Sequence, residues 1–129
     1  GNPVSCRAAM MTIELLEKGL IRNAADQGEY LMAGLREMQK THECMGDVRG
    51  KGLMVGVELV TDRETKEPAR GWRNRIIRAA FEKGLLLLGG GENTIRFCPS
   101  LTVTSEEIDR CLSIFDEAIN AVPDQHPGT

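Results

Sequence analysis

The stretch of sequence that decides the fold occupies positions 89–101 and reads Gly89-Gly90-Gly91-Glu92-Asn93-Thr94-Ile95-Arg96-Phe97-Cys98-Pro99-Ser100-Leu101. It follows four consecutive leucines at positions 85–88, which predict a buried strand. Residues 94–97 predict a second strand, and the glycine-rich residues 89–93 predict a hairpin turn between the two. Side chains alternate between the two faces of a strand, so Ile95 and Phe97 point to one face and Arg96 points to the other.

Arg96 is the candidate binding residue of the chain. Its guanidinium is always charged, and its planar fork of donors fits the two oxygens of a carboxylate. A cation on the far side of a small sheet is therefore well suited to gripping a carboxylate. The alternative is an ordinary surface arginine beside an acidic neighbour, because most charged side chains are solvated.

Two further strands are predicted upstream of this hairpin. The longer one covers residues 53–60, and a short one precedes it around residues 47–50. The apolar side chains that line one face of the longer strand are Leu53, Val55, Val57 and Leu59. Glu58 alternates with them, so it lies either on a solvated face or in a polar interface. Residues 61–68 are polar and predict an exposed loop.

Helical periodicity and capping signals predict four helices. The first begins at Asn2 and Pro3 and ends at Gly19, and the next two cover residues 21–40 and 69–83. The last follows a capping box formed by Thr104 and Glu107. The apolar stripes are Val4, Ala8, Met11 and Leu15; Ala24, Leu31, Leu35 and Met38; Trp72, Ile76, Ala79 and Ala80; and Ile108, Leu112, Phe115 and Ile119. Gly28 fills a position on the second helix where close packing is expected.

The predicted order is helix, helix, strand, strand, helix, strand, strand, helix. This order is typical of an α+β layer in which helices cover a small, mainly antiparallel sheet. The chain has 129 residues, which indicates one domain over residues 1–122. Residues 123–129 are polar and contain proline, so they predict a flexible tail.

Composition excludes several classes of protein. The net charge of −3 argues against a general nucleic-acid binder, which needs a basic face. No apolar run approaches the roughly 20 residues needed to cross a bilayer. The four cysteines form no CxxC pair and have no histidine at metal-ligand spacing, so we expect reduced thiols, no metal site and a cytoplasmic protein. No secretory leader precedes Gly1, and the abrupt start suggests that the chain is a cut piece.

The glycine-rich segments do not match known phosphate-binding motifs. Only three residues separate Gly46 from Gly50, and Lys51 is followed by Gly52 instead of a serine or threonine. A tight turn with positive φ or close backbone approach is the better interpretation of that segment. No acid/base pair and no nucleophilic triad are visible, so the residues supply one candidate anion-binding group and no catalytic residue.

Three segments of the chain resemble the C-terminal part of class III aminotransferases, which use pyridoxal phosphate and include 4-aminobutyrate, ornithine and acetylornithine aminotransferases. Gly1-Asn2-Pro3-Val4-Ser5-Cys6-Arg7-Ala8-Ala9 resembles the GGNP-x-x-C-A-A helix start of the family. The second segment, positions 47–59, resembles its VRG-x-GLM-x-G-x-E-L strand. Positions 84–101 and 104–108 resemble its GLL…G…IRF-x-PPL…T-x-E-E-I ending, except that Ser100 replaces the second proline.

The resemblance implies a fold and a function. The chain would be the small C-terminal domain of a fold-type I pyridoxal-phosphate enzyme, which transfers an amino group between an amino acid and a 2-oxo acid. Arg96 matches the arginine that binds the substrate carboxylate. Gly1 and Asn2 would lie close to a loop that helps to hold the cofactor phosphate of the neighbouring subunit in a homodimer. 4-Aminobutyrate or another ω-amino acid is a candidate donor.

The resemblance also implies what this chain lacks. The Schiff-base lysine, the aspartate that pairs with the cofactor's pyridine nitrogen and the phosphate-binding loops of the family would all lie upstream of Gly1. Neither Lys51 nor Lys83 matches the position of that lysine. The isolated chain is therefore expected to bind little pyridoxal phosphate and to be inactive without its large domain.

Two alternatives remain open at this point. The chain could be a stand-alone module that binds a small ligand or dimerises, because a fold does not determine a function. Within the resemblance, the complete protein could instead be a racemase or an aminomutase that uses the same cofactor.

Overall fold

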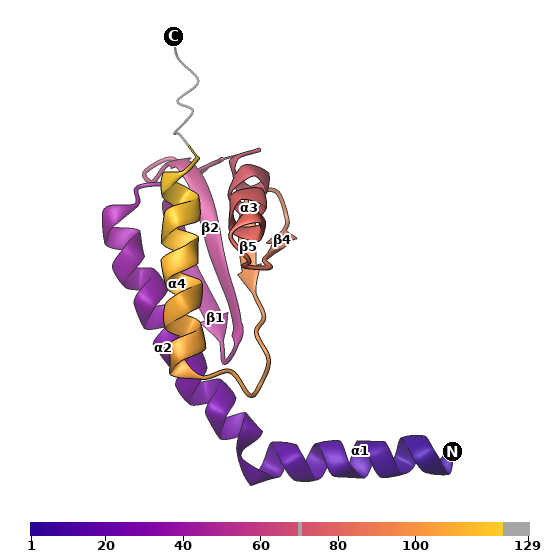
Figure 1. The fold of residues 1–129 in the computed structure, drawn as a ribbon. Helices are drawn as coiled ribbons and strands as arrows, with labels where there is room; N and C mark the ends of the chain where they lie inside the picture. The colour runs from indigo at the N-terminus through magenta and orange to yellow at the C-terminus, as the bar shows by residue number, and fades with distance from the viewer. Residues whose placement is uncertain (70, 123–129) are drawn as a thin grey trace.

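The computed structural model describes residues 1–69 and 71–122. The elements, in chain order, are α1 (Pro3–Leu15), the π-helical turn η1 (Leu16–Leu20), α2 (Ile21–Thr41), β1 (Met45–Lys51), β2 (Met54–Asp62), β3 (Glu67–Pro68), α3 (Trp72–Glu82), β4 (Leu88–Gly90), β5 (Thr94–Phe97) and α4 (Ser105–Asn120) (Figure 1). The predicted α+β class and element order are confirmed, with the two-residue β3 as an addition. The predicted tail lies outside the described residues.

The sheet has the strand order β1-β2-β5-β4, and each neighbouring pair is antiparallel. β3 pairs with the end of β2. The residues before and after the β1–β2 turn, Lys51 and Met54, face each other, so Gly52 and Leu53 form a two-residue hairpin loop. Gly52 has a φ of +55°, which a residue with a side chain rarely adopts. The prediction of a tight turn at this position is confirmed.

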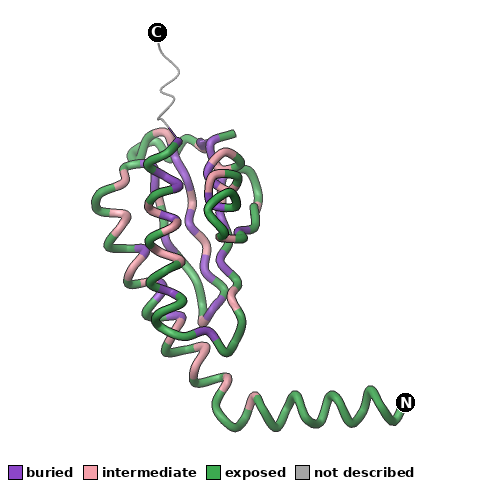
Figure 2. Tube along the Cα trace, in the orientation of Figure 1, coloured by how far each residue is buried: buried purple, intermediate pink, exposed green. Residues whose placement is uncertain are grey.

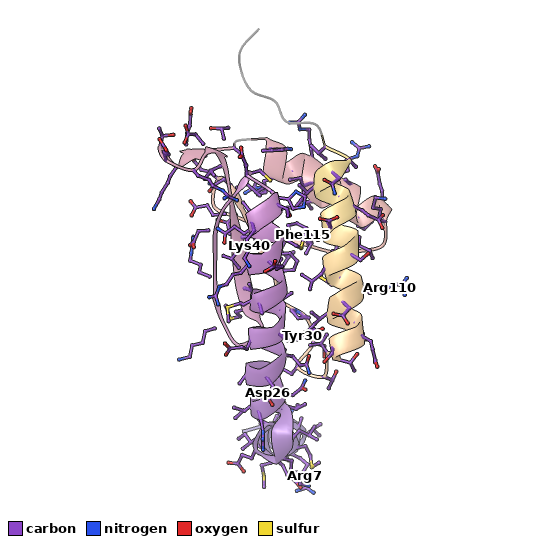
Figure 3. The ribbon with its side chains drawn as sticks, turned by 90° about the vertical axis from the view of Figure 1, so that its left-hand side faces the viewer. Arg7, Asp26, Tyr30, Lys40, Arg110 and Phe115 are labelled. Carbon is purple, nitrogen blue, oxygen red and sulfur yellow. The ribbon has the colours of Figure 1, made fainter. Side chains whose placement is uncertain are left out.

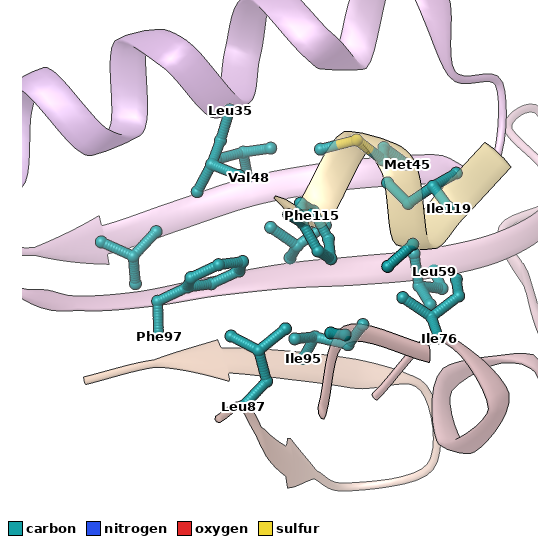
Figure 4. Close-up of a cluster of buried hydrophobic side chains, with 14 of the residues drawn as sticks. Leu35, Met45, Val48, Leu59, Ile76, Leu87, Ile95, Phe97, Phe115 and Ile119 are labelled. Atoms are coloured by element: carbon teal, nitrogen blue, oxygen red, sulfur yellow. The ribbon is translucent and has the colours of Figure 1, made fainter. Parts of the chain in front are cut away.

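One face of the sheet carries the core. Buried side chains from α2, α3 and α4 pack against the buried side chains of β1, β2 and β5 (Figure 4). Leu35 of α2, Ile76 of α3 and Ile119 of α4 belong to this one cluster. At its centre the rings of Phe97 and Phe115 meet edge to face, with centroids 5.0 Å apart and an interplanar angle of 88°. The three helices therefore cover one face and leave the other face, which carries Arg96, open.

α2 lies against the β1–β2 turn with no side chain between the two backbones. A Cβ on Gly28 would lie 2.2 Å from the carbonyl oxygen of Gly52, a separation that side chains do not adopt. α2 also lies beside α4, as Figure 3 shows. The predicted close packing at Gly28 is confirmed, and its partner is the hairpin loop.

The first helix differs from the other three. α1 begins as predicted, with the Asn2 side chain accepting a hydrogen bond from the Val4 backbone N–H at 2.9 Å. Gly19, with φ 156° and ψ −14°, interrupts the helical path within η1. α1 then projects away from the sheet and buries none of its residues (Figure 2). The apolar side chains of Val4, Met11 and Leu15 are therefore exposed.

The structure corrects two predictions. Residues 85–88 do not form a buried strand: β4 begins only at Leu88, and Leu86 and Leu88 are exposed while Leu87 is buried. The strand instead includes Gly89 and Gly90, which pair with Ile95 and Thr94. The predicted loop over residues 61–68 is shorter, because its two ends belong to β2 and β3.

The last helix begins as predicted. The Thr104 hydroxyl accepts from the Glu107 N–H at 3.3 Å, and the Glu107 carboxylate accepts from the Thr104 N–H at 2.9 Å.

Over the described part of the chain, no helix has the length and apolar character needed to cross a membrane.

Candidate functional site

Arg96 lies in the interior of the sheet on its open face. β5 runs between β2 and β4, and Arg96 pairs with Gly56 on one side and Leu88 on the other. The side chain is exposed because the helices cover the opposite face. It makes no hydrogen bond and no ion pair with any residue in the described ranges 1–69 and 71–122. Arg96 is thus a solvent-exposed arginine, as the alternative has it, but it has no acidic partner among the described residues.

A second arginine lies on the same face, across Gly56. Arg49 of β1 pairs with Gly56 and donates hydrogen bonds to Asp47 at 2.6 Å and to Glu58 at 3.0 Å. The hydrogen bond to Asp47, followed by the one to Glu58, raises the pKa of Arg49. Glu58 is thus half-buried in a polar cluster and does not lie on a merely solvated face. The two arginines differ because internal carboxylates engage only Arg49.

The hairpin that carries Arg96 is fastened at its turn. Asn93, the buried polar residue of the described chain, donates from Nδ2 to the Leu59 carbonyl at 2.7 Å. Its own carbonyl accepts from the Leu59 N–H at 2.9 Å. Arg73 of α3 donates from Nη1 to the carbonyls of Gly90 and Gly91. Neither residue was predicted from the sequence, although an asparagine next to a glycine-rich turn is a signal for a structural role of Asn93.

A cleft of about 400 Å³ includes Arg96 among its lining residues. Its wall is mainly apolar and combines the leucines that precede β4 with residues from the segment after β5 and from α4. Cys98 and Cys111 also line it, and burial raises the pKa of the Cys111 thiol to about 11. All four cysteines lie in the described ranges, and none of them forms a disulfide there. The cleft thus combines one cation, Arg96, and one carboxylate, Glu107, with a largely apolar wall.

The structure does not bring Gly1 and Asn2 together with Arg96. Both are exposed at the start of α1, which projects from the body of the fold (Figure 1). The Asn2 side-chain oxygen already caps α1. Lys51 is exposed in the hairpin, and Lys83 forms an ion pair with Glu117 at 2.8 Å. No cluster of metal-ligating side chains occurs among the residues placed by the structure.

Comparison with known proteins identifies the chain. The sequence model described as class III aminotransferase matches residues 1–119. The chain belongs to this family. The class III aminotransferases were the family that the three sequence segments indicated, so that prediction is confirmed.

Known proteins that are similar to the chain in sequence are much longer than it. The leucine/methionine racemase of Thermococcus litoralis is 43% identical over an alignment of 129 positions, which covers 99% of this chain and 29% of the racemase. The acetylornithine aminotransferase of Caldanaerobacter subterraneus is 36% identical over 123 residues, 95% of this chain and 29% of that enzyme. A solved amine transaminase from an uncultivated Pseudomonas species, in its pyridoxal-phosphate-bound form, superposes with a TM-score of 0.88 and 33% identity over 94% of this chain and 28% of its own.

The cleft does not fit the cofactor of this family by itself. A covalently held pyridoxal phosphate needs a lysine, and a lysine is absent from the residues that line the cleft. Its cationic group is Arg96, which is suited to a carboxylate because of its planar fork of donors. The cleft thus contains a guanidinium that suits a carboxylate, and its lining contains no lysine that could hold the cofactor. The chain spans about 29% of the length of the class III relatives that it matches.

Proposed function

We propose that the chain is the C-terminal part of a pyridoxal-phosphate-dependent aminotransferase that transfers an amino group between an amino acid and a 2-oxo acid. 4-Aminobutyrate or another ω-amino acid is the candidate donor. One observation carries the proposal: Arg96 lies on the open face without a polar partner in the described ranges and lines a cleft, in a chain of the class III family. A carboxylate is the group common to amino acids and 2-oxo acids, and it is the anion that a guanidinium binds through two hydrogen bonds.

In this proposal Arg96 binds and orients the substrate. Holding the carboxylate fixes the position and direction of the substrate's amino group. The reaction then behaves as an intramolecular step between groups that are already oriented. The cofactor, when bound, supplies the electron sink for the bonds at the amino-bearing carbon.

The remaining parts of the enzyme are proposed from the family resemblance. The lysine that holds the cofactor would belong to a large domain outside this chain, so the isolated chain should not bind pyridoxal phosphate or turn over substrate. The complete enzyme would be a cytoplasmic homodimer, with Gly1 and Asn2 close to the phosphate of the neighbouring subunit's cofactor.

A racemase is the second candidate, and the similarities to curated proteins favour it specifically. The racemase of Thermococcus litoralis is more similar to this chain than the acetylornithine aminotransferase, at 43% against 36% identity. An isoleucine 2-epimerase of Lentilactobacillus buchneri is 38% identical over 95% of the chain. A racemase also needs a group that holds the substrate carboxylate, so the position of Arg96 is compatible with both reactions.

The requirement for a second substrate distinguishes the two candidates. We expect the complete enzyme, supplied with 4-aminobutyrate or an L-amino acid, to release product only when a 2-oxo acid such as 2-oxoglutarate is added. Chiral chromatography of the same mixtures would detect inversion. If the enantiomer of a supplied L-amino acid accumulates with no 2-oxo acid present, the racemase is correct and the aminotransferase is wrong.

Replacement of Arg96 tests the binding residue. In the complete enzyme, Arg96→Ala should lower kcat/KM about 100-fold, mainly through KM, because a two-point ionic contact of about 3 kcal/mol is lost. Steady-state kinetics with each substrate measures this effect. Arg96→Lys should recover only part of it, since an ammonium lacks the planar fork.

The matched control for this experiment is Arg49→Ala on the same open face. It removes a cation of the same type, but one that is engaged by Asp47 and Glu58. We expect KM to change less than about 3-fold, because exposed ion pairs contribute little. Equal kcat and KM values for Arg96→Ala and the unmodified enzyme would contradict the proposal that Arg96 binds the substrate carboxylate.

A further inference from the structure

β4 contains two consecutive glycines that each lie against the side chain of an arginine, on opposite faces of the strand. A Cβ on Gly89 would lie 3.2 Å from Cζ and 3.3 Å from Nε of Arg73, which reaches β4 from α3. A Cβ on Gly90 would lie 2.9 Å from Cδ and 3.2 Å from Cγ of Arg96. The aliphatic part of Arg96 therefore lies across the space that a side chain at position 90 would fill.

The backbone conformation does not explain the glycine at position 90. Five glycines of the described chain have positive φ, among them Gly91 at +54° in the turn, and Gly90 is not one of them. Gly90 pairs with Thr94 as an ordinary residue of the antiparallel ladder. A residue with a side chain could adopt this backbone, so what the glycine provides is room on the open face.

The room at Gly90 matters because nothing else that the structure describes holds Arg96 in place. The guanidinium has no hydrogen bond or ion pair in the described ranges, and its neighbours across the two ladders are Gly56 and Leu88. A long side chain without such contacts samples many rotamers, and ordering it on binding costs affinity. Packing of its stem against the flat backbone of β4 reduces the rotamers that it can sample.

We propose that Gly90 is a positioning residue for Arg96. The absence of a side chain at position 90 lets the aliphatic part of the arginine lie on β4, which orients the guanidinium before a carboxylate binds. This inference rests on the proposed function, because it concerns the geometry of the same binding group. A methyl group at position 90 displaces the Arg96 stem. It leaves the fold intact, since the atoms that it meets belong to an exposed, flexible side chain.

A double-mutant cycle in the complete holoenzyme tests the proposal. Gly90→Ala is expected to raise KM for the amino acid about 10-fold with kcat changed less than about 2-fold, because a small misplacement of a binding group weakens binding strongly. In the Arg96→Ala background the same substitution should have no further effect, since a residue that acts only through Arg96 has nothing left to position.

Gly56→Ala provides the matched control. Gly56 lies on the same face and pairs directly with Arg96, but a Cβ there would meet Cγ2 of Thr94 at 3.3 Å and no atom of Arg96 within 4 Å. Its KM should equal that of the unmodified enzyme. A crystal structure of Gly90→Ala gives a readout independent of activity, and Arg96 Cδ should lie farther from β4 in it.

The outcomes separate this inference from the proposed function. If Arg96→Ala raises KM and Gly90→Ala does not, or if Gly90→Ala has the same effect with and without Arg96, the positioning role is wrong and the proposed function stands. An unmoved Arg96 side chain in the Gly90→Ala structure also overturns the positioning role. If Arg96→Ala leaves KM unchanged, the proposed function fails and this inference fails with it.

Discussion

Replacement of Gly28 by alanine is expected to lower the free energy of unfolding by about 3 kcal/mol, although alanine favours helix formation over glycine by about 1 kcal/mol. The added methyl group would lie 2.2 Å from the Gly52 carbonyl oxygen and 2.3 Å from its carbon. Both are backbone atoms of a two-residue hairpin loop, so they cannot move without opening the turn or lifting α2 from the sheet. Equilibrium unfolding in urea measures the difference.

Gly34→Ala on the same helix is the control. Its methyl group would lie 2.3 Å from Leu112 Cδ1, which is the end of a flexible side chain that can adopt another rotamer. The gain in helix propensity then offsets most of the cost, and we expect a change of less than about 1 kcal/mol. Equal losses of stability in the two variants would contradict the prediction that contact with the hairpin backbone excludes a side chain at position 28.

Replacement of Phe115 by alanine is expected to lower the free energy of unfolding by about 4 kcal/mol. Phe115 is fully buried at 0% exposure, and its ring meets Phe97 edge to face at the centre of the core. The substitution leaves a cavity between α4 and β5 that the surrounding elements cannot close, because they are packed against one another. Thermal or urea unfolding, followed by circular dichroism, measures the loss.

The control for Phe115 is Phe81→Ala on α3. Phe81 is 66% exposed, so its truncation should change stability by less than about 0.5 kcal/mol. A loss for Phe115→Ala as small as that for Phe81→Ala would contradict the assignment of Phe115 to the core. Phe97 and Arg96 are adjacent on β5 and point to opposite faces, so a cavity beneath Phe97 should also loosen the strand that carries Arg96.

The features predicted correctly from sequence are those that local chemistry specifies. The capping box of Thr104 and Glu107, the alternation of residues 53–60 and the glycine turn at Gly52 each depend on a few neighbouring residues. Gly28 was also assigned correctly, because a glycine inside an apolar helix stripe usually marks close packing. These signals were sufficient for the α+β class and for placing Arg96 on the open face.

The errors arose where residues distant in sequence decide the structure. The leucine run predicts a buried strand over residues 85–88, and the glycines predict that Gly89 and Gly90 belong to the turn. In the structure these glycines pair with β5, and the side chains of Arg73 and Arg96 fill the space that they leave. No local rule predicts that the side chains of two arginines will fill this space, because one lies 16 positions before Gly89 and the other six positions after Gly90.

The contrast between the two arginines of the open face has a consequence for anion selectivity. A carboxylate that approaches Arg49 must compete with Asp47 and Glu58, which are already in contact with its guanidinium. A carboxylate that reaches Arg96 meets no such competitor among the described residues. We therefore expect the two arginines on opposite sides of Gly56 to differ in their affinity for a carboxylate, because Asp47 and Glu58 compete with the ligand for Arg49 alone.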